Sequence, residues 1–114
     1  MNRFFLKKNM RIAKFSFDNS YIKKFHQFND KFIKIFSILN EFFYPRIGII
    51  ISKTVSKYSY KRNFLRRIIK ESFRIKQYIL FKMDFIIIVK SNFVKMRRNI
   101  IYNYLNKIWL RYSK

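Results

Sequence analysis

The sequence predicts an α+β fold, a two-layer α/β sandwich in which one small sheet carries helices on one face. Two apolar runs, residues 46–53 (RIGIIISK) and 83–90 (MDFIIIVK), are rich in β-branched side chains and predict buried strands. Residues 59–79 and 94–112 repeat apolar side chains at the helical period. Because strands and helices alternate along the chain, we expect the helices to pack on the sheet.

Residues 59–79 (SYKRNFLRRIIKESFRIKQYI) predict the helix around which the chain is organised, with Ser59 or Ser56 as its N-cap. One side is expected to be apolar: Phe64, Leu65, Ile68, Ile69, Ser72, Ile75 and Ile79. The other side carries Arg62, Asn63, Arg66, Arg67, Lys70 and Arg74. A basic helix face is commonly just a solvated face. Here most charges are arginines, whose planar fork fits phosphate, and only Glu71 is acidic.

The other elements are less regular. Residues 6–16 predict a short helix, residues 17–30 are expected to be irregular, and residues 40–45 predict a turn. Residues 32–39 alternate as a strand does, with Ile33 and Ile35 on one face. The last helix, residues 94–112, places Trp109 in or beside the core. The expected order is helix, strand, strand, long helix, strand, helix.

Phe32, Lys34 and Phe36 would occupy the opposite face of that alternating strand. One interpretation is a half-exposed strand in a chain that is rich in phenylalanine. The other is a stacking surface, because exposed aromatic rings between lysines suit single-stranded nucleic acid.

The charge balance indicates a polyanionic partner. The 114 residues predict a single domain, residues 1–114, with a net charge of +22. Such a charge destabilises a compact state unless it is neutralised, which favours a nucleic acid or an anionic membrane. The abundance of Lys, Ile, Asn, Phe and Tyr is also typical of AT-biased coding, so the arginine cluster weighs more than scattered lysines.

Several function classes are disfavoured. The chain has no cysteine, hence no disulfide or thiolate site, and His26 is the single histidine. The acids show no spacing typical of a two-carboxylate or metal site: Asp18, Asp30, Glu41, Glu71 and Asp84. No apolar run approaches the roughly 18 residues of a membrane span. We therefore expect a cytoplasmic protein without a metal site of its own.

Three segments carry a resemblance to a known family. Residues 45–53 (PRIGIIISK), 60–74 (YKRNFLRRIIKESFR) and 83–90 (MDFIIIVK) resemble the bacterial ribonuclease P protein component. The most specific part is Arg62-Asn63-Phe64-Leu65-Arg66-Arg67, followed by Glu71, Phe73 and Arg74 at the family's spacing. The N-terminal region, residues 1–31, is divergent and similar only through Leu6, Lys7 and Lys8.

The resemblance implies a protein subunit of ribonuclease P, the ribonucleoprotein that removes the 5′ leader of precursor tRNA. It implies that a catalytic RNA carries the active site and its Mg²⁺ ions, and that this RNA and precursor tRNA are the partners, without DNA or membrane. It also implies a left-handed βαβ crossover, against the usual right-handed rule. The leader would lie in a cleft between the first helix and the open face of the sheet.

The site residues follow from that resemblance and from the basic face. The catalytic RNA is expected to contact Lys53, Lys61, Arg62, Asn63, Arg66, Arg67, Lys70 and Arg74. The leader is expected to contact Ile12, Phe15, Phe32, Lys34 and Phe36. The family commonly has aromatic residues at the first-helix positions where this chain has Ile12 and Ser16.

Two alternatives remain at the level of sequence. The chain could be another small basic RNA-binding protein, such as a ribosomal protein, that shares only the central helix. It could also be a basic amphipath acting on membranes, but buried strands have no role in such a peptide.

Overall fold

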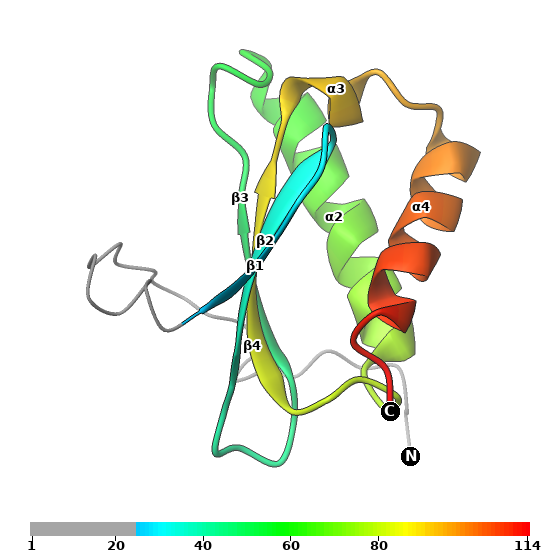
Figure 1. Ribbon diagram of the computed structural model, residues 1–114. Helices are drawn as coiled ribbons and strands as arrows, with labels where there is room; N and C mark the ends of the chain where they lie inside the picture. Colours follow the sequence, from blue (N-terminus) through cyan, green and yellow to red (C-terminus); the bar gives the residue numbers. More distant parts are fainter. Residues whose placement is uncertain (1–24) are drawn as a thin grey trace.

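The computed structural model describes residues 25–114. The elements, labelled as in Figure 1, are β1 (His26–Asn29), β2 (Ile33–Leu39), β3 (Arg46–Ile50), α2 (Ser59–Lys76), β4 (Met83–Val89), α3 (Ser91–Val94) and α4 (Arg98–Leu110). The helix expected at residues 6–16, with Ile12 and Phe15, lies outside the described residues. So does most of the divergent region 1–31.

The strands form one sheet in the order β1-β2-β4-β3, and α2 and α4 cover one of its faces (Figure 1). β2 pairs antiparallel with β1 and with β4, whereas β3 pairs parallel with β4. The expected α+β class, with helices on one face of a small sheet, is confirmed.

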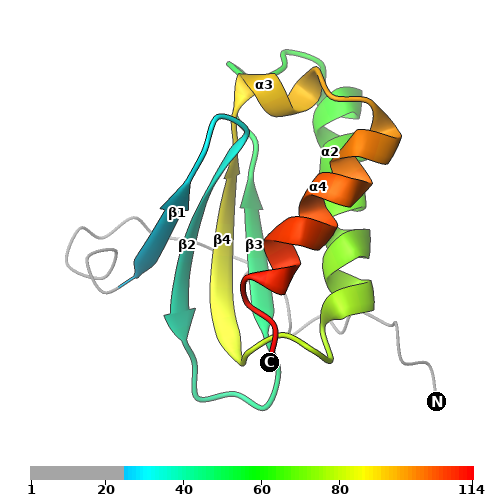
Figure 2. The ribbon, with the colours of Figure 1, turned by 45° about the vertical axis from the view of Figure 1, so that its right-hand side comes forward.

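The connection from β3 through α2 to β4 is left-handed. In Figure 2 the helices lie to the right of the sheet and toward the viewer, both parallel strands run upward, and β4 lies to the left of β3. A right-handed crossover with the helix in front would move to the right. The handedness implied by the resemblance is therefore the one observed.

The main core lies between the sheet and the two long helices. The rings of Phe73, Phe85 and Trp109 meet edge to face, with centroids 5.6 to 6.4 Å apart. Ile33, Ile35 and their neighbours on the same face of the sheet complete this cluster. Trp109 is fully buried, as expected, and its indole Nε1 donates a hydrogen bond to Ser72 Oγ at 2.8 Å.

β1 corrects the expectation that residues 17–30 are irregular. His26 to Asn29 pair with Ser37 to Lys34 of β2, and Asp30 closes the hairpin. Its Oδ1 accepts hydrogen bonds from the amides of Phe32 at 2.8 Å and Ile33 at 2.9 Å. Cross-strand pairing and this turn form the strand, because its four residues have no period of their own.

The two long helices differ in their bounds from the sequence prediction. α2 begins at Ser59 itself, and the N-cap is Tyr58, which has an extended backbone and no side-chain cap bond. It ends at Lys76 instead of residue 79. The expected final helix is interrupted after Val94, and α4 starts only at Arg98.

The buried face of α2 also differs from the expected one. Leu65, Ile68, Ile69 and Ser72 are buried as predicted, and Phe73 joins them. Phe64, Ile75 and Ile79 are instead more than a third exposed. Phe64 turns toward α4, where the Arg98 guanidinium lies 5.6 Å from its ring centroid. The stripe that covers the sheet is thus narrower than the apolar stripe of the sequence.

Candidate nucleic-acid interface

The outward side of α2 carries the basic residues that the sequence singled out. Asn63 and Arg67 are exposed, and Arg66, Lys70 and Arg74 are partly exposed. Two contacts order these side chains: Arg66 Nη1 donates to Asn63 Oδ1 at 3.2 Å, and Arg74 forms an ion pair with Glu71. Glu71 therefore neutralises part of this face at its C-terminal half and leaves Arg66 and Arg67 as the charges at its centre.

Lys53, Lys61 and Arg62 lie at the N-terminal end of α2. Arg62 is partly buried because its guanidinium folds back onto the connection from β3 and donates to the Ser56 carbonyl at 2.7 Å. Lys53, on that same connection, is exposed, and so is Lys61. The structure thus brings these three cations to one end of the basic face.

Two tyrosines at this end were missed in the sequence prediction. Tyr58 and Tyr60 are both exposed, with ring centroids 5.6 Å apart. The ammonium groups of Lys57 and Lys61 lie 5.2 and 5.4 Å from the Tyr58 ring centroid. The alternation KYSYK at residues 57–61 is the signal that could have indicated them, since rings beside cations can stack on bases.

The open face of the sheet is the one opposite the helices. The pairing register places Lys34, Phe36 and Ile38 of β2 on the same face as Ile86 and Ile88 of β4. Phe25, Phe36 and Ile86 form a second small apolar cluster there. This face is mostly aliphatic, and the charged side chain that β2 contributes to it is the partly exposed Lys34.

Phe36 is on the open face, but it is not an exposed stacking ring as we expected. Only 4% of Phe36 is exposed. Phe25 packs edge-on against it, with centroids 6.5 Å apart, and Lys34 Nζ lies 5.0 Å from its centroid. The ring is covered by Phe25, which directly precedes β1, a strand that the sequence prediction lacked.

Phe32 does not share a face with Lys34 and Phe36, so its placement was wrong. It precedes β2 and packs against the main core on the helix side. Its ring meets that of Tyr104 in α4 edge to face at 5.2 Å. Because β2 begins only at Ile33, after the hairpin turn at Asp30, Phe32 is not part of the strand's alternation of faces. Its ring therefore packs against the main core.

An ion pair anchors the end of the open face. Arg46 Nε and Nη2 donate to the two carboxylate oxygens of Asp84 at 2.7 and 2.5 Å. Asn40 adds a third hydrogen bond to Asp84 at 2.9 Å. A lone acid inside the apolar run of residues 83–90 is the signal for such a partner, because a buried carboxylate requires one.

Residues 25–114 contain neither a cluster of metal-ligating side chains nor a helix that could span a membrane. No group of three or more His, Cys, Asp or Glu side chains is placed to hold a metal ion in that part of the chain. None of its helices is long and apolar enough to span a bilayer.

Comparison with known proteins decides which family this is. The family model described as Ribonuclease P matches residues 6–113. The ribonuclease P protein component of Buchnera aphidicola subsp. Schizaphis graminum is 34% identical over 114 residues, which span 100% of this chain and 99% of that relative. This chain belongs to the ribonuclease P protein family. The family resemblance of residues 45–53, 60–74 and 83–90 is thereby confirmed, and the ribosomal and membrane alternatives are set aside.

Other members of the ribonuclease P protein family are also similar to this chain in sequence or in structure. The component from Baumannia cicadellinicola is 46% identical over 76 residues, covering 67% of this chain and 66% of that relative. The structure of the Staphylococcus aureus RNase P protein superposes with a TM-score of 0.77 at 27% identity, covering 90% of this chain and 93% of that one. The Thermotoga maritima RNase P protein, at 20% identity, shares the fold with a TM-score of 0.72 over 86% and 94% of the two chains.

Proposed function

We propose that this chain is the protein subunit of ribonuclease P and assists the removal of the 5′ leader from precursor tRNA in the cytoplasm. Family membership supports the assignment. The observation that carries the mode of action is the outward side of α2, where Arg66 and Arg67 lie opposite the buried Leu65, Ile68 and Ile69. A helix anchored in the core on one side presents arginine forks to phosphate on the other.

In this proposal the RNA subunit carries the active site and binds the catalytic Mg²⁺ ions. The contacts of the protein's carboxylates are structural, which supports a role in binding for the protein. Three of the four Asp and Glu side chains within residues 25–114, those of Asp30, Glu71 and Asp84, are each engaged by neighbouring donors in the fold. The protein supplies positive charge and position, which lets two polyanions, the catalytic RNA and precursor tRNA, lie close together.

The face of α2 is proposed to contact the catalytic RNA through Asn63, Arg66, Arg67, Lys70 and Arg74, with Lys53, Lys61 and Arg62 at its N-terminal end. Arg62 donates to the Ser56 carbonyl, so it holds the β3–α2 connection as well as adding charge. Each phosphate that a cation neutralises releases counterions, and binding should therefore weaken steeply with salt.

The leader is proposed to cross the open face beside Lys34, with Ile12 and Phe15 contributing from the N-terminal region. Phe36 supports this contact from below, because its buried ring lies under the Lys34 ammonium. In this arrangement Lys34 contacts the leader phosphates, and the partly exposed Ile38 and Ile88 form the apolar surface beside it.

Reconstitution tests the assignment. The purified protein is mixed with a bacterial ribonuclease P RNA at low Mg²⁺, and cleavage of precursor tRNA is measured with and without a leader. We expect stimulation that is larger with the leader, and loss of that difference in Lys34→Ala. Stimulation that ignores the leader would remove the open face from the proposal. Tight RNA binding without stimulation would overturn the function itself.

The double variant Arg66→Ala with Arg67→Ala tests the α2 face. We expect weaker binding to the ribonuclease P RNA and a shallower dependence of log affinity on log salt, by about two phosphate contacts. The matched control, Lys95→Ala with Lys107→Ala, removes two exposed charges elsewhere on the chain. An identical salt slope in the two double variants would contradict the assignment of this face.

A further inference from the structure

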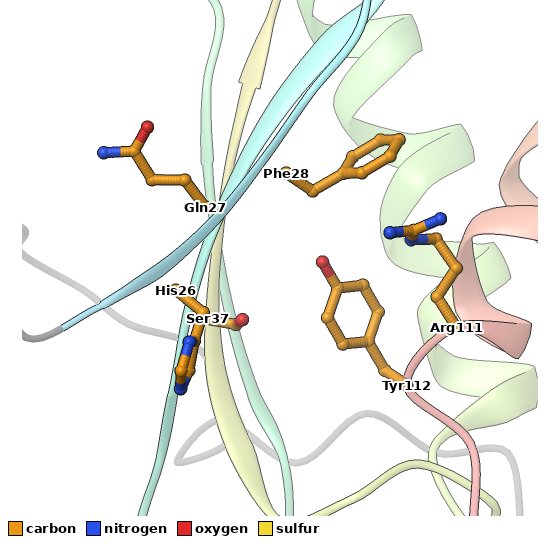
Figure 3. A pocket seen from close by; sticks show the side chains of 6 residues that line it. All are labelled: His26, Gln27, Phe28, Ser37, Arg111 and Tyr112. Carbon is orange, nitrogen blue, oxygen red and sulfur yellow. The ribbon is translucent and has the colours of Figure 1, made fainter.

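A cavity of about 430 Å³ lies beside the outer strand β1. Its lining residues come from β1, from β2 and from the residues that follow α4: His26, Gln27, Phe28, Ser37, Arg111 and Tyr112. In Figure 3 the side chains of Phe28, Arg111 and Tyr112 project into the space between β1 and the end of α4, and Gln27 points to the other side of the strand. The cavity is thus on the helix side of the sheet, separated by β1 from the open face.

Two of its walls are held in place by contacts with the rest of the fold. The Arg111 guanidinium lies 4.3 Å from the centroid of the Phe28 ring, which keeps this exposed cation over the cavity. The Tyr112 ring packs edge to face on Phe85 at 5.0 Å, and its carbonyl accepts the Phe81 amide at 2.8 Å. A ligand would therefore meet groups that are already positioned.

The lining offers donors and no negative charge. Arg111 contributes a guanidinium, Ser37 and Tyr112 contribute hydroxyls, and His26 contributes a ring N–H. Burial raises the pKa of Tyr112, while the charge of Arg111 and the hydrogen bonds of the Tyr112 hydroxyl with Ser37 and Arg111 act to lower it, so these three side chains already meet around the hydroxyl. This donor set matches an anion with several oxygen atoms.

The C-terminal end of a helix ordinarily repels anions, because its last carbonyls are unpaired. Here three of the carbonyls in the last turn of α4 are occupied. Those of Ile108 and Trp109 accept the amides of Arg111 at 3.1 Å and Tyr112 at 3.0 Å, and that of Leu110 accepts Ser113 Oγ at 2.9 Å. The Arg111 charge then dominates the local field.

We propose that this cavity binds one phosphate group, with Arg111 as its charged ligand and Ser37, Tyr112 and His26 as further donors. The phosphate belongs either to a single-stranded RNA that passes the β1 edge or to a free mononucleotide. The site is separate from α2 and from the open face. The result of the reconstitution experiment therefore neither supports nor contradicts it.

The single histidine makes the test direct, because the His26 Hε1 proton gives the one imidazole signal of its kind in the NMR spectrum of the full chain. At constant ionic strength and pH, we expect this signal to shift and saturate with inorganic phosphate and with adenosine 5′-monophosphate. Adenosine, which lacks the phosphate, should not shift it. A shift that grows linearly without saturation, or an equal shift with adenosine, would overturn the proposal.

Variants separate the site from general charge. Arg111→Ala should weaken phosphate binding by about tenfold or more, because it removes a charge-assisted hydrogen bond. Tyr112→Phe should weaken it less and keep the ring packing. Lys95→Ala, the control, removes an exposed lysine between α3 and α4 and should change nothing. Unchanged Trp109 fluorescence shows that each variant is folded, and equal affinity in Arg111→Ala would refute the site.

A short single-stranded RNA distinguishes the two sources of phosphate. If the strand produces the same saturating His26 shift and competes with inorganic phosphate, the ligand is a phosphate of RNA. If inorganic phosphate and the mononucleotide bind but the strand does not compete, the ligand is a free nucleotide. Competition that persists undiminished in Arg111→Ala would count against both.

Discussion

At the scale of single residues, Ser72 shows why a polar side chain lies in the buried stripe of α2. Its hydroxyl accepts the hydrogen bond from the indole of Trp109, the single tryptophan of the chain, at 2.8 Å. Both residues are buried, and the Trp109 ring packs against Phe73 and Phe85. The bond satisfies the one polar atom of the largest core side chain and fixes α4 against α2.

Ser72→Ala should therefore destabilise the protein by about 1–3 kcal/mol, because it leaves a buried N–H without a partner. Denaturant unfolding followed by Trp109 fluorescence measures the change. Ser59→Ala, at the exposed first position of the same helix, should stay within about 0.5 kcal/mol of the parent chain. Equal effects of the two substitutions would mean that the indole bond contributes nothing.

The ionisation of Asp30 is linked to the stability of the fold. Burial alone would raise the pKa of Asp30, but hydrogen bonds from the Tyr104 hydroxyl at 2.5 Å and from the amides of Ile33 and Phe32, with Lys90 nearby, lower it. A lowered native pKa gives stability that is present above the unfolded-state pKa of about 3.9. That stability is lost as the pH falls through the native value.

Tyr104→Phe should be less stable than the parent chain at neutral pH, and the gap should narrow as the pH falls from about 5 to about 2. Protonated Asp30 no longer benefits as much from the Tyr104 hydroxyl, which explains the narrowing. Free energies of unfolding at several pH values measure it. The control is Tyr102→Phe in the same helix, and a gap for Tyr104→Phe that stays constant down to pH 2 would contradict this account.

At the scale of the element, α2 separates two neighbouring apolar residues. Leu65 is 3% exposed and faces the sheet, whereas Phe64 is 40% exposed beside Arg98. The boundary between the buried and the basic side therefore falls between consecutive positions, as the rotation of about 100° per residue allows.

Leu65→Asp should abolish the cooperative thermal transition, because it places an unpaired charge in the core. Phe64→Asp, one residue earlier, should retain a native-like transition and near-native circular dichroism. Thermal melts of both variants provide the measurement. If the two behaved alike, the rotation of α2 about its axis would be other than described.

At the scale of the whole molecule, fold and charge oppose each other. The core between the sheet and the helices holds together a chain of net charge +22. The basic groups on α2 and the cations around the open face repel one another across the surface. Such self-repulsion weakens the compact state until a polyanion or salt reduces it.

The melting temperature of the free protein should therefore rise as salt is increased from about 0.05 M to about 0.5 M, since the Debye length shortens. Ribonuclease P RNA should raise it further at low salt and less at high salt. Differential scanning fluorimetry at matched protein concentration tests both trends. A melting temperature that falls steadily with salt would show that attractive ion pairs, such as Arg46–Asp84, outweigh the repulsion.

Most elements could be predicted from local patterns. The apolar runs at residues 46–53 and 83–90 became β3 and β4, and the long amphipathic segment became α2. β1 could not be predicted in this way, because HQFN has neither a period nor a strong strand propensity. Its pairing with β2 and the Asp30 turn create it.

The sequence by itself determined the class of the fold, the basic side of α2 and the family, because periodicity, arginine spacing and motif order are local properties of the chain. The tertiary structure alone decided what each remaining side chain faces. It covered Phe36 with Phe25, turned Phe32 toward Tyr104, paired Arg46 with Asp84 and brought Arg111 to β1. Each of these contacts joins residues from different elements, and their positions follow only once sheet and helices have packed together.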